Sequence, residues 1–167
     1  MASLLLLSTS RVHGTAYLEH ALPALDVFLG PCRRVAFIPY ALKDRDAYAQ
    51  KARAAFLQIG REVVSLHEAG SPRDALREAP AVFVGGGNTF RLLDVLYTLD
   101  LMDPLRQRVR EGLLYSGASA GANLAGPALI AGAVLGLAGI LVRLPAIRLS
   151  RVPGAGRKVG AAEPDTV

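Results

Sequence analysis

Residues 81–89 read Ala-Val-Phe-Val-Gly-Gly-Gly-Asn-Thr, a run of four apolar residues that passes directly into three glycines. Four apolar residues without polar alternation are typical of a strand that is buried on both faces. A helical pattern follows from Phe90 to Tyr97, so the segment is predicted to be a strand, a glycine loop and a helix in succession. This order favours a parallel sheet that is covered by helices.

The same alternation extends outward from this segment in both directions. Further short apolar strands are predicted at 4–7, 35–38, 63–66 and 113–115. Helical patterns are predicted at 17–29, 46–59, 72–78 and 104–111. Strands that alternate with helices predict the α/β class, and we expect a three-layer sandwich with a mostly parallel, doubly wound sheet and right-handed crossovers.

Length and composition exclude several classes of protein. The chain has 167 residues, enough for one domain, and its 51% hydrophobic content excludes a largely disordered chain. Cys32 is the single cysteine, so no intrachain disulfide can form. The apolar run at 4–7 is too short for the core of a signal peptide. We therefore expect a cytoplasmic protein.

The last forty residues differ in composition from the rest. Residues 128–167 are rich in Ala, Gly, Pro and Arg and hold five basic against two acidic residues, a large share of the net charge of +5. We therefore expect a domain at 1–127, a poorly ordered tail at 128–167 and no binding of nucleic acid. Residues 124–142 carry no charge and approach the length of a membrane span, but their Gly and Ala content favours a buried or poorly ordered segment.

Residues 117–121 read Gly-Ala-Ser-Ala-Gly and follow the strand predicted at 113–115. This G-x-S-x-G pattern is typical of a sharp strand-to-helix turn that exposes a nucleophilic serine above the sheet. The small neighbours of Ser119 avoid clashes at such a turn, and the helix start supplies N–H groups to a developing oxyanion. The alternative is a turn of small residues without chemistry, but the preceding strand favours the nucleophile.

The three glycines at 85–87 form a second candidate loop. They match neither a dinucleotide fingerprint nor a Walker loop, because Phe90 stands where a glycine is needed and no Gly-Lys-Ser/Thr follows. Glycines at the end of a strand let the backbone approach a ligand closely, and their N–H groups can complete an oxyanion hole with Ala120. The alternative is a tight turn before an Asn/Thr helix cap.

The sequence gives no sign of a metal site or of a cofactor. Its three histidines, His13, His20 and His67, show no metal-ligand spacing with one another or with Cys32. Asp44 and Asp46 are better explained as helix-capping residues than as paired catalytic carboxylates. We expect neither a metal nor a cofactor.

Residues 4–125 resemble peptidase E, the α-aspartyl dipeptidase family of serine peptidases. The matching segments are Leu-Leu-Leu-Leu-Ser at 4–8, Tyr-Leu-Glu-His-Ala at 17–21, Phe-Ile-Pro-Tyr at 37–40, Val-Gly-Gly-Gly-Asn-Thr-Phe at 84–90 and Gly-Ala-Ser-Ala-Gly-Ala-Asn-Leu at 117–124. The resemblance implies a glutamine-amidotransferase-like fold and metal-free hydrolysis of dipeptides with an N-terminal aspartate. It implies that Ser119 is the nucleophile and that Gly86, Gly87 and Ala120 belong to the oxyanion hole.

The resemblance ends near Pro127. In the family the serine is followed by an acidic residue and a histidine of the triad, whereas residues 120–167 contain no histidine. We therefore expect this chain to be weak or inactive as a dipeptidase. The alternatives are a catalytically dead relative that binds or regulates through the same pocket, and a substitute base, His13 or His67, brought to Ser119 by the fold.

Overall fold

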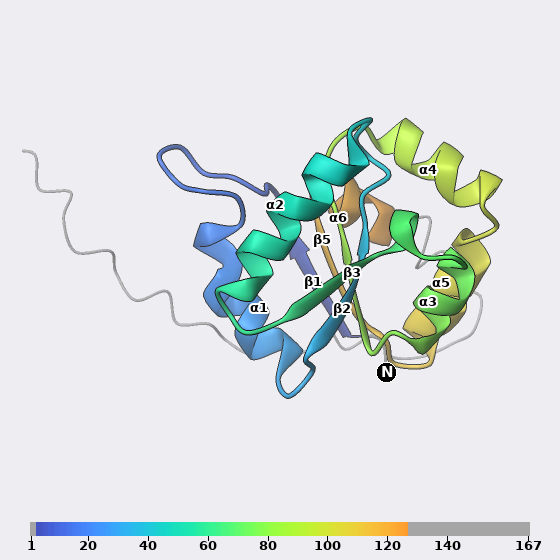
Figure 1. Cartoon of the computed structure of the whole chain (residues 1–167), viewed down its shortest axis with the longest axis horizontal. Helices are drawn as coiled ribbons and strands as arrows, with labels where there is room; N and C mark the ends of the chain where they lie inside the picture. Colours follow the sequence, from blue (N-terminus) through green and yellow to red (C-terminus); the bar gives the residue numbers. More distant parts are fainter. Residues whose placement is uncertain (1–2, 127–167) are drawn as a thin grey trace, which may run out of the picture. The chain divides into compact units, whose positions relative to one another are not determined.

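The structure is a computed structural model that describes residues 3–126. Its sheet contains five parallel strands, in the spatial order β1-β5-β4-β2-β3 (Figure 1). The strands are β1 (Ser3–Leu7), β2 (Arg34–Ile38), β3 (Glu62–Ser65), β4 (Ala81–Val84) and β5 (Leu114–Ala118). In the register of the central pair, Val84 lies opposite Gly117, so both candidate loops begin at the same end of neighbouring strands.

Helices cover both faces of the sheet. One face carries α1 (Leu22–Leu29) and α2 (Arg45–Leu57), and the other carries α3 (Pro72–Glu78), α4 (Thr89–Thr98), α5 (Met102–Arg110) and α6 (Ala120–Ala125). Short 3₁₀ helices η1 (Glu19–Ala21) and η2 (Leu66–Glu68) complete the described elements. The predicted α/β class and the three-layer, doubly wound sandwich are confirmed.

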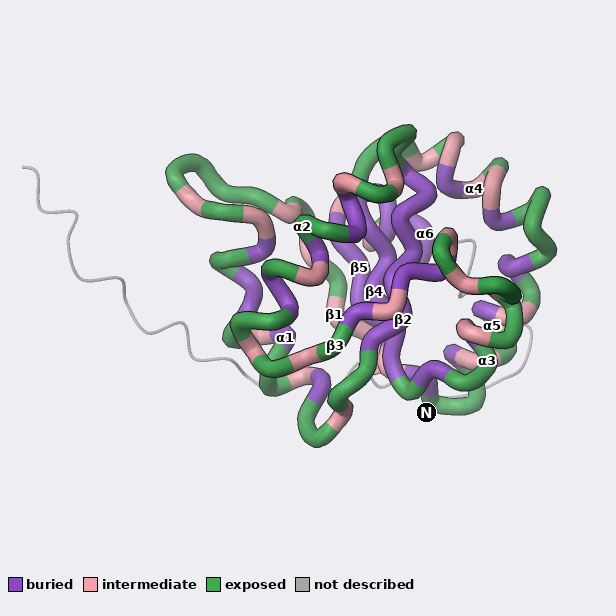
Figure 2. Tube along the Cα trace, in the orientation of Figure 1, coloured by how far each residue is buried: buried purple, intermediate pink, exposed green. Residues whose placement is uncertain are grey.

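Two apolar cores hold the layers together, one on each face of the sheet. The core under α1 and α2 includes the packed rings of Phe37, Phe56 and Phe83, while the opposite core is mostly aliphatic. Figure 2 shows the central strands as the most deeply buried part of the described chain. All four residues of β4 are buried, as its continuous apolar run predicts, whereas β1 lies at an edge and is only partly buried.

Several predicted element boundaries are wrong, among them the end of the helix expected at 46–59, which stops at Leu57. The helix expected at 17–29 begins only at Leu22, because Leu18 adopts the left-handed conformation with φ 61° and a 3₁₀ turn follows it. Pro23 lies in the first turn of α1, where a backbone N–H has no acceptor within the helix, so the lack of an N–H in proline breaks no hydrogen bond. Leu66 belongs to η2 and not to the preceding strand, and β5 continues to Ala118 through Gly117.

Within residues 3–126, the helices are all too short or too polar to cross a membrane. The expectations for the tail at 128–167, and for most of the uncharged segment at 124–142, concern residues outside the described part of the chain. The boundary proposed at 127 therefore stays a prediction.

Candidate active site

Ser119 lies at a sharp turn between β5 and α6. Its backbone has φ 51° and ψ −108°, a conformation that a residue with a side chain adopts at a cost of about 1–3 kcal/mol. The turn is tied down because the Ser119 N–H donates to Leu7 O at 2.9 Å, and Ser119 O accepts from Asn123 N at 2.9 Å. The strand-to-helix turn expected from the G-x-S-x-G pattern is present, in the strained form typical of a nucleophile elbow.

Close contacts between backbones explain the two glycines of this turn. A Cβ added at Gly117 would lie 2.7 Å from the carbonyl carbon and oxygen of Gly121. A Cβ added at Gly121 would overlap the carbonyl oxygen of Val84, on the neighbouring strand. The start of α6 can therefore cross the ends of β4 and β5 only if both positions lack a side chain.

Replacement of Gly121 by alanine is expected to destabilise the fold by about 3 kcal/mol, because neither Val84 nor the helix backbone can move away from the new methyl group. Helix propensity alone would favour the alanine by about 1 kcal/mol, so the sign of the effect tests the contact. Gly70→Ala is the matched control, since a Cβ there meets nothing within 4 Å. Urea unfolding of both variants measures the difference; equal stability would contradict the crowded turn.

The second glycine loop, residues 85–87, lies against the Ser119 turn. A Cβ added at Gly86 would lie 3.1 Å from Ser119 Cβ and 3.0 Å from Ala118 O. The loop is fixed at both ends, because Gly85 N–H donates to Ile38 O and Asn88 N–H donates to Ala41 O, each at 3.0 Å. The two candidate loops are thus neighbours because β4 and β5 are neighbours.

Several backbone N–H donors near Ser119, that of Gly86 among them, have no partner within the described residues. The N–H groups of Gly87 and Ala120 make no hydrogen bond to another residue within 3–126. Gly87 has φ +140°, and a Cβ on it would meet Ala41 O at 2.7 Å, so only glycine fits there. Asn88 caps α4 by accepting from Arg91 N at 2.9 Å, so the loop is also the predicted capping turn.

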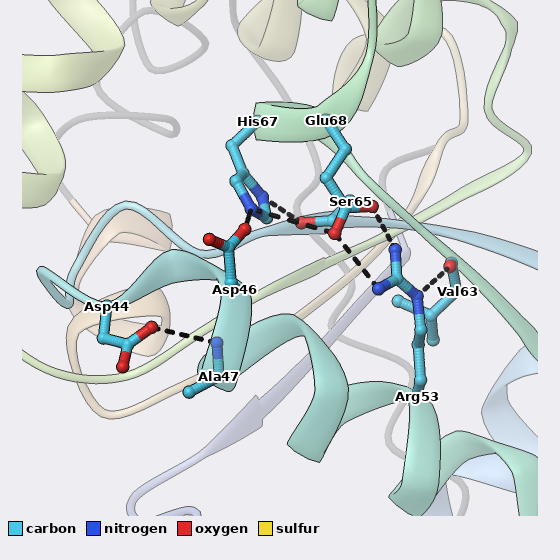
Figure 3. Close-up of polar contacts among 8 residues, drawn as sticks. All are labelled: Asp44, Asp46, Ala47, Arg53, Val63, Ser65, His67 and Glu68. Atoms are coloured by element: carbon cyan, nitrogen blue, oxygen red, sulfur yellow. Dashed lines mark hydrogen bonds and ion pairs between the residues drawn. The ribbon is translucent and has the colours of Figure 1, made fainter.

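The structure does not bring His67 to Ser119. His67 lies in η2 after β3, which is separated from β5 by β4 and β2, three strand spacings or about 14 Å. Both of its ring nitrogens are engaged, Nδ1 with Ser65 Oγ at 2.7 Å and Nε2 with Asp46 Oδ1 at 2.9 Å (Figure 3). His13 and His20 are exposed and make no hydrogen bond to a described residue. The substitute-base alternative receives no support from His67.

Sequence reasoning missed the cluster of Asp46, His67 and Glu68, whose potential metal-ligating atoms lie within 4.8 Å of one another. Asp46 is distant from the other two in the sequence, so no ligand spacing signals it. Glu68 is already paired with Arg53, whose Nη1 lies 3.1 Å from Glu68 Oε1 and whose hydrogen bonds lower the pKa of Glu68. We assign the group to an ion-pair network.

The two aspartates near the start of α2 have different roles. Asp44 caps the helix as predicted, since its Oδ1 accepts from Ala47 N at 3.0 Å. The capping role predicted for Asp46 is wrong, because its carboxylate bonds His67 instead. A surface cavity of about 560 Å³ lies nearby, between α2 and β3, and its lining includes Arg53 and Val63 but not Ser119.

Comparisons with known proteins identify the relatives of this chain. Residues 4–136 match the sequence model of a protein family that is described as "Peptidase family S51". Peptidase E of Streptomyces coelicolor is 53% identical over 127 residues, which are 76% of this chain and 52% of that protein. The "Probable alpha-aspartyl dipeptidase" of Drosophila melanogaster is 51% identical over 126 residues, covering 74% of this chain and 52% of the relative.

A solved structure shares the fold. The crystal structure of a candidate peptidase E protein from Listeria monocytogenes EGD-e superposes with a TM-score of 0.61 and 26% identity, over 75% of this chain and 62% of that one. The chain spans about half the length of the curated relatives named above. The family match runs to residue 136, beyond the limit near 125 at which the visible resemblance ends.

Proposed function

Because the chain belongs to peptidase family S51, we propose that it carries the nucleophile and oxyanion hole of a serine-type dipeptidase that acts on dipeptides with an N-terminal aspartate. One observation carries this proposal: a strained serine at a strand-to-helix turn lies directly against a glycine loop. The names of the relatives, peptidase E and alpha-aspartyl dipeptidase, supply the substrate class.

In this proposal Ser119 Oγ attacks the carbonyl carbon of the peptide bond, and the carbonyl oxygen becomes an oxyanion. The N–H groups of Gly87 and Ala120, with Gly86 in the same loop, are positioned to stabilise that charge. Collapse of the intermediate breaks the C–N bond, and the leaving amine takes a proton while the aspartyl group stays on Ser119. Water then hydrolyses this ester.

Each of these steps requires a base that accepts the Ser119 proton, and this requirement supports a second candidate function. No histidine stands among residues 120–167, and His67 is held elsewhere by Asp46 and Ser65. A chain with a nucleophile and donors but without a base would bind an aspartyl peptide and turn it over poorly. A binding or regulatory relative is therefore the alternative.

Incubation with Asp-Leu at high protein concentration separates the two functions. Release of free aspartate, followed by liquid chromatography and mass spectrometry, is expected for a dipeptidase, and Asn-Leu is the control of equal shape. Calorimetric binding of Asp-Leu without aspartate release would favour the binding relative. Neither binding nor release of aspartate from Asp-Leu would contradict both functions.

A further inference from the structure

The side chain of Tyr48 bonds the glycine loop at 85–87 from the core that α1 and α2 cover. It lies in the first turns of α2 and is 4% exposed. Its hydroxyl donates to the carbonyl oxygen of Gly86 at 3.1 Å. Its ring also touches Gly85, where an added Cβ would lie 2.6 Å from Tyr48 Cε1. The proposed mechanism makes no use of this contact.

The bond from Tyr48 fixes the direction of the next N–H in the chain. In a trans peptide the C=O and the following N–H point in opposite directions, and the described chain contains no cis peptide. The Gly86 carbonyl is held toward Tyr48, so the Gly87 N–H points away from it. The Gly87 N–H has no hydrogen-bond partner among residues 3–126.

We propose that Tyr48 is a positioning residue for the oxyanion hole, because its hydroxyl holds the Gly86–Gly87 peptide with the Gly87 N–H directed to the oxyanion that forms at Ser119. This inference rests on the proposed function and deepens it. A glycine peptide has little steric preference of its own, so an orienting bond is needed. Donation to the carbonyl also polarises the peptide, which makes its N–H a stronger donor.

The surroundings of Tyr48 keep its hydroxyl in the donating form. Burial raises the pKa of both Tyr48 and Tyr17, so both hydroxyls stay protonated at neutral pH. Tyr17 donates to the Tyr48 oxygen at 3.3 Å, which leaves the Tyr48 proton for Gly86. Edge-to-face packing against Phe37, with ring centroids 5.1 Å apart, immobilises the ring.

Tyr48→Phe and Tyr17→Phe form a matched pair of variants. Each removes one hydroxyl from the same aromatic cluster and keeps the ring, but only Tyr48→Phe breaks the bond to Gly86. The substrate is the p-nitrophenyl ester of aspartate, whose leaving group needs no proton, since an oxyanion hole retains catalysis without a complete triad. We expect Tyr48→Phe to lower the rate constant of Ser119 acylation about tenfold, less than the loss of a whole donor, and Tyr17→Phe to change that rate constant less than about twofold.

An amide readout keeps the test independent of activity. In ¹H–¹⁵N spectra of the 167-residue chain, the Gly87 cross-peak is expected to shift or broaden in Tyr48→Phe and to stay in place in Tyr17→Phe, with the cross-peaks of residues 81–84 unchanged in both. An unmoved Gly87 amide in Tyr48→Phe would overturn the inference. Hydrolysis that depends on Ser119 but equals wild type in Tyr48→Phe would also overturn it and leave the proposed function intact, whereas hydrolysis independent of Ser119 would refute the function itself.

Discussion

The 167-residue chain is expected to cleave an aspartyl dipeptide about a millionfold more slowly than a full-length peptidase E, the loss that removal of the base causes in a serine peptidase. The physical reason is that residues 120–167 contain no histidine that could take the Ser119 proton and pass it to the leaving amine, and that His67 is held by Asp46 on the far side of the sheet. Release of aspartate from Asp-Leu by this chain and by the Streptomyces coelicolor enzyme, under the same conditions, measures the ratio.

An activated ester serves as the control for this comparison. Its leaving group departs without a proton, so the deficit of the chain relative to the full-length enzyme is expected to be much smaller on the p-nitrophenyl ester of aspartate than on Asp-Leu. A chain that cleaves Asp-Leu at the rate of the full-length enzyme would show that another group takes the Ser119 proton. An equal deficit on both substrates would show that protonation of the leaving amine is not the lost step.

Ser119→Ala is expected to abolish acylation of the chain by the same ester, because no nucleophile is then left beside the donors of the oxyanion hole. Ser116→Ala is the matched control. Ser116 lies in β5, the strand that leads to Ser119; it is fully buried, and its hydroxyl donates to Val82 O at 3.0 Å. Its loss is expected to cost about 1 kcal/mol of stability and no activity per folded molecule.

Rates of the initial burst of p-nitrophenol, which report acylation, compare these two serine variants after correction for the fraction folded by circular dichroism. Equal rates for Ser119→Ala and wild type would exclude Ser119 as the nucleophile. A loss of activity in Ser116→Ala as large as that in Ser119→Ala would show that the strand, and not the serine hydroxyl, is what the reaction needs.

Local patterns predict the parts of this fold that depend on neighbouring residues. The apolar run at 81–84 indicates a strand buried on both faces, and the leucines at 22, 25 and 29 indicate the buried side of α1. The G-x-S-x-G pattern predicts the turn at Ser119, because backbone atoms come so close in such a turn that a side chain does not fit at either glycine. Adjacency of the two glycine loops follows from the pairing of β4 with β5.

Features that depend on contacts between residues far apart in the sequence could not be predicted from local sequence patterns. The sequence does not indicate that Tyr48 contacts the glycine loop, since its hydrogen bond to Gly86 joins residues 38 positions apart. The pairing of Asp46 with His67 likewise arises only when η2 packs over the start of α2. The helix expected from residue 17 begins only at Leu22, and the N–H of Leu18, which precedes it, donates to Ser10 O, a contact that the sequence pattern does not indicate. Tertiary contacts override local preference at all three places.

Formation of an acyl-enzyme tests the central claim, that Ser119 is the nucleophile, most directly. An acyl group transferred from the p-nitrophenyl ester of aspartate should persist on this chain, because hydrolysis of the acyl-enzyme needs a general base and residues 120–167 contain no histidine. The account predicts that mass spectrometry of the digested chain finds one aspartyl group on the peptide containing Ser119, and none on that peptide in Ser119→Ala. An aspartyl group on another residue, or ester turnover that leaves Ser119 unmodified and survives its replacement, would contradict it.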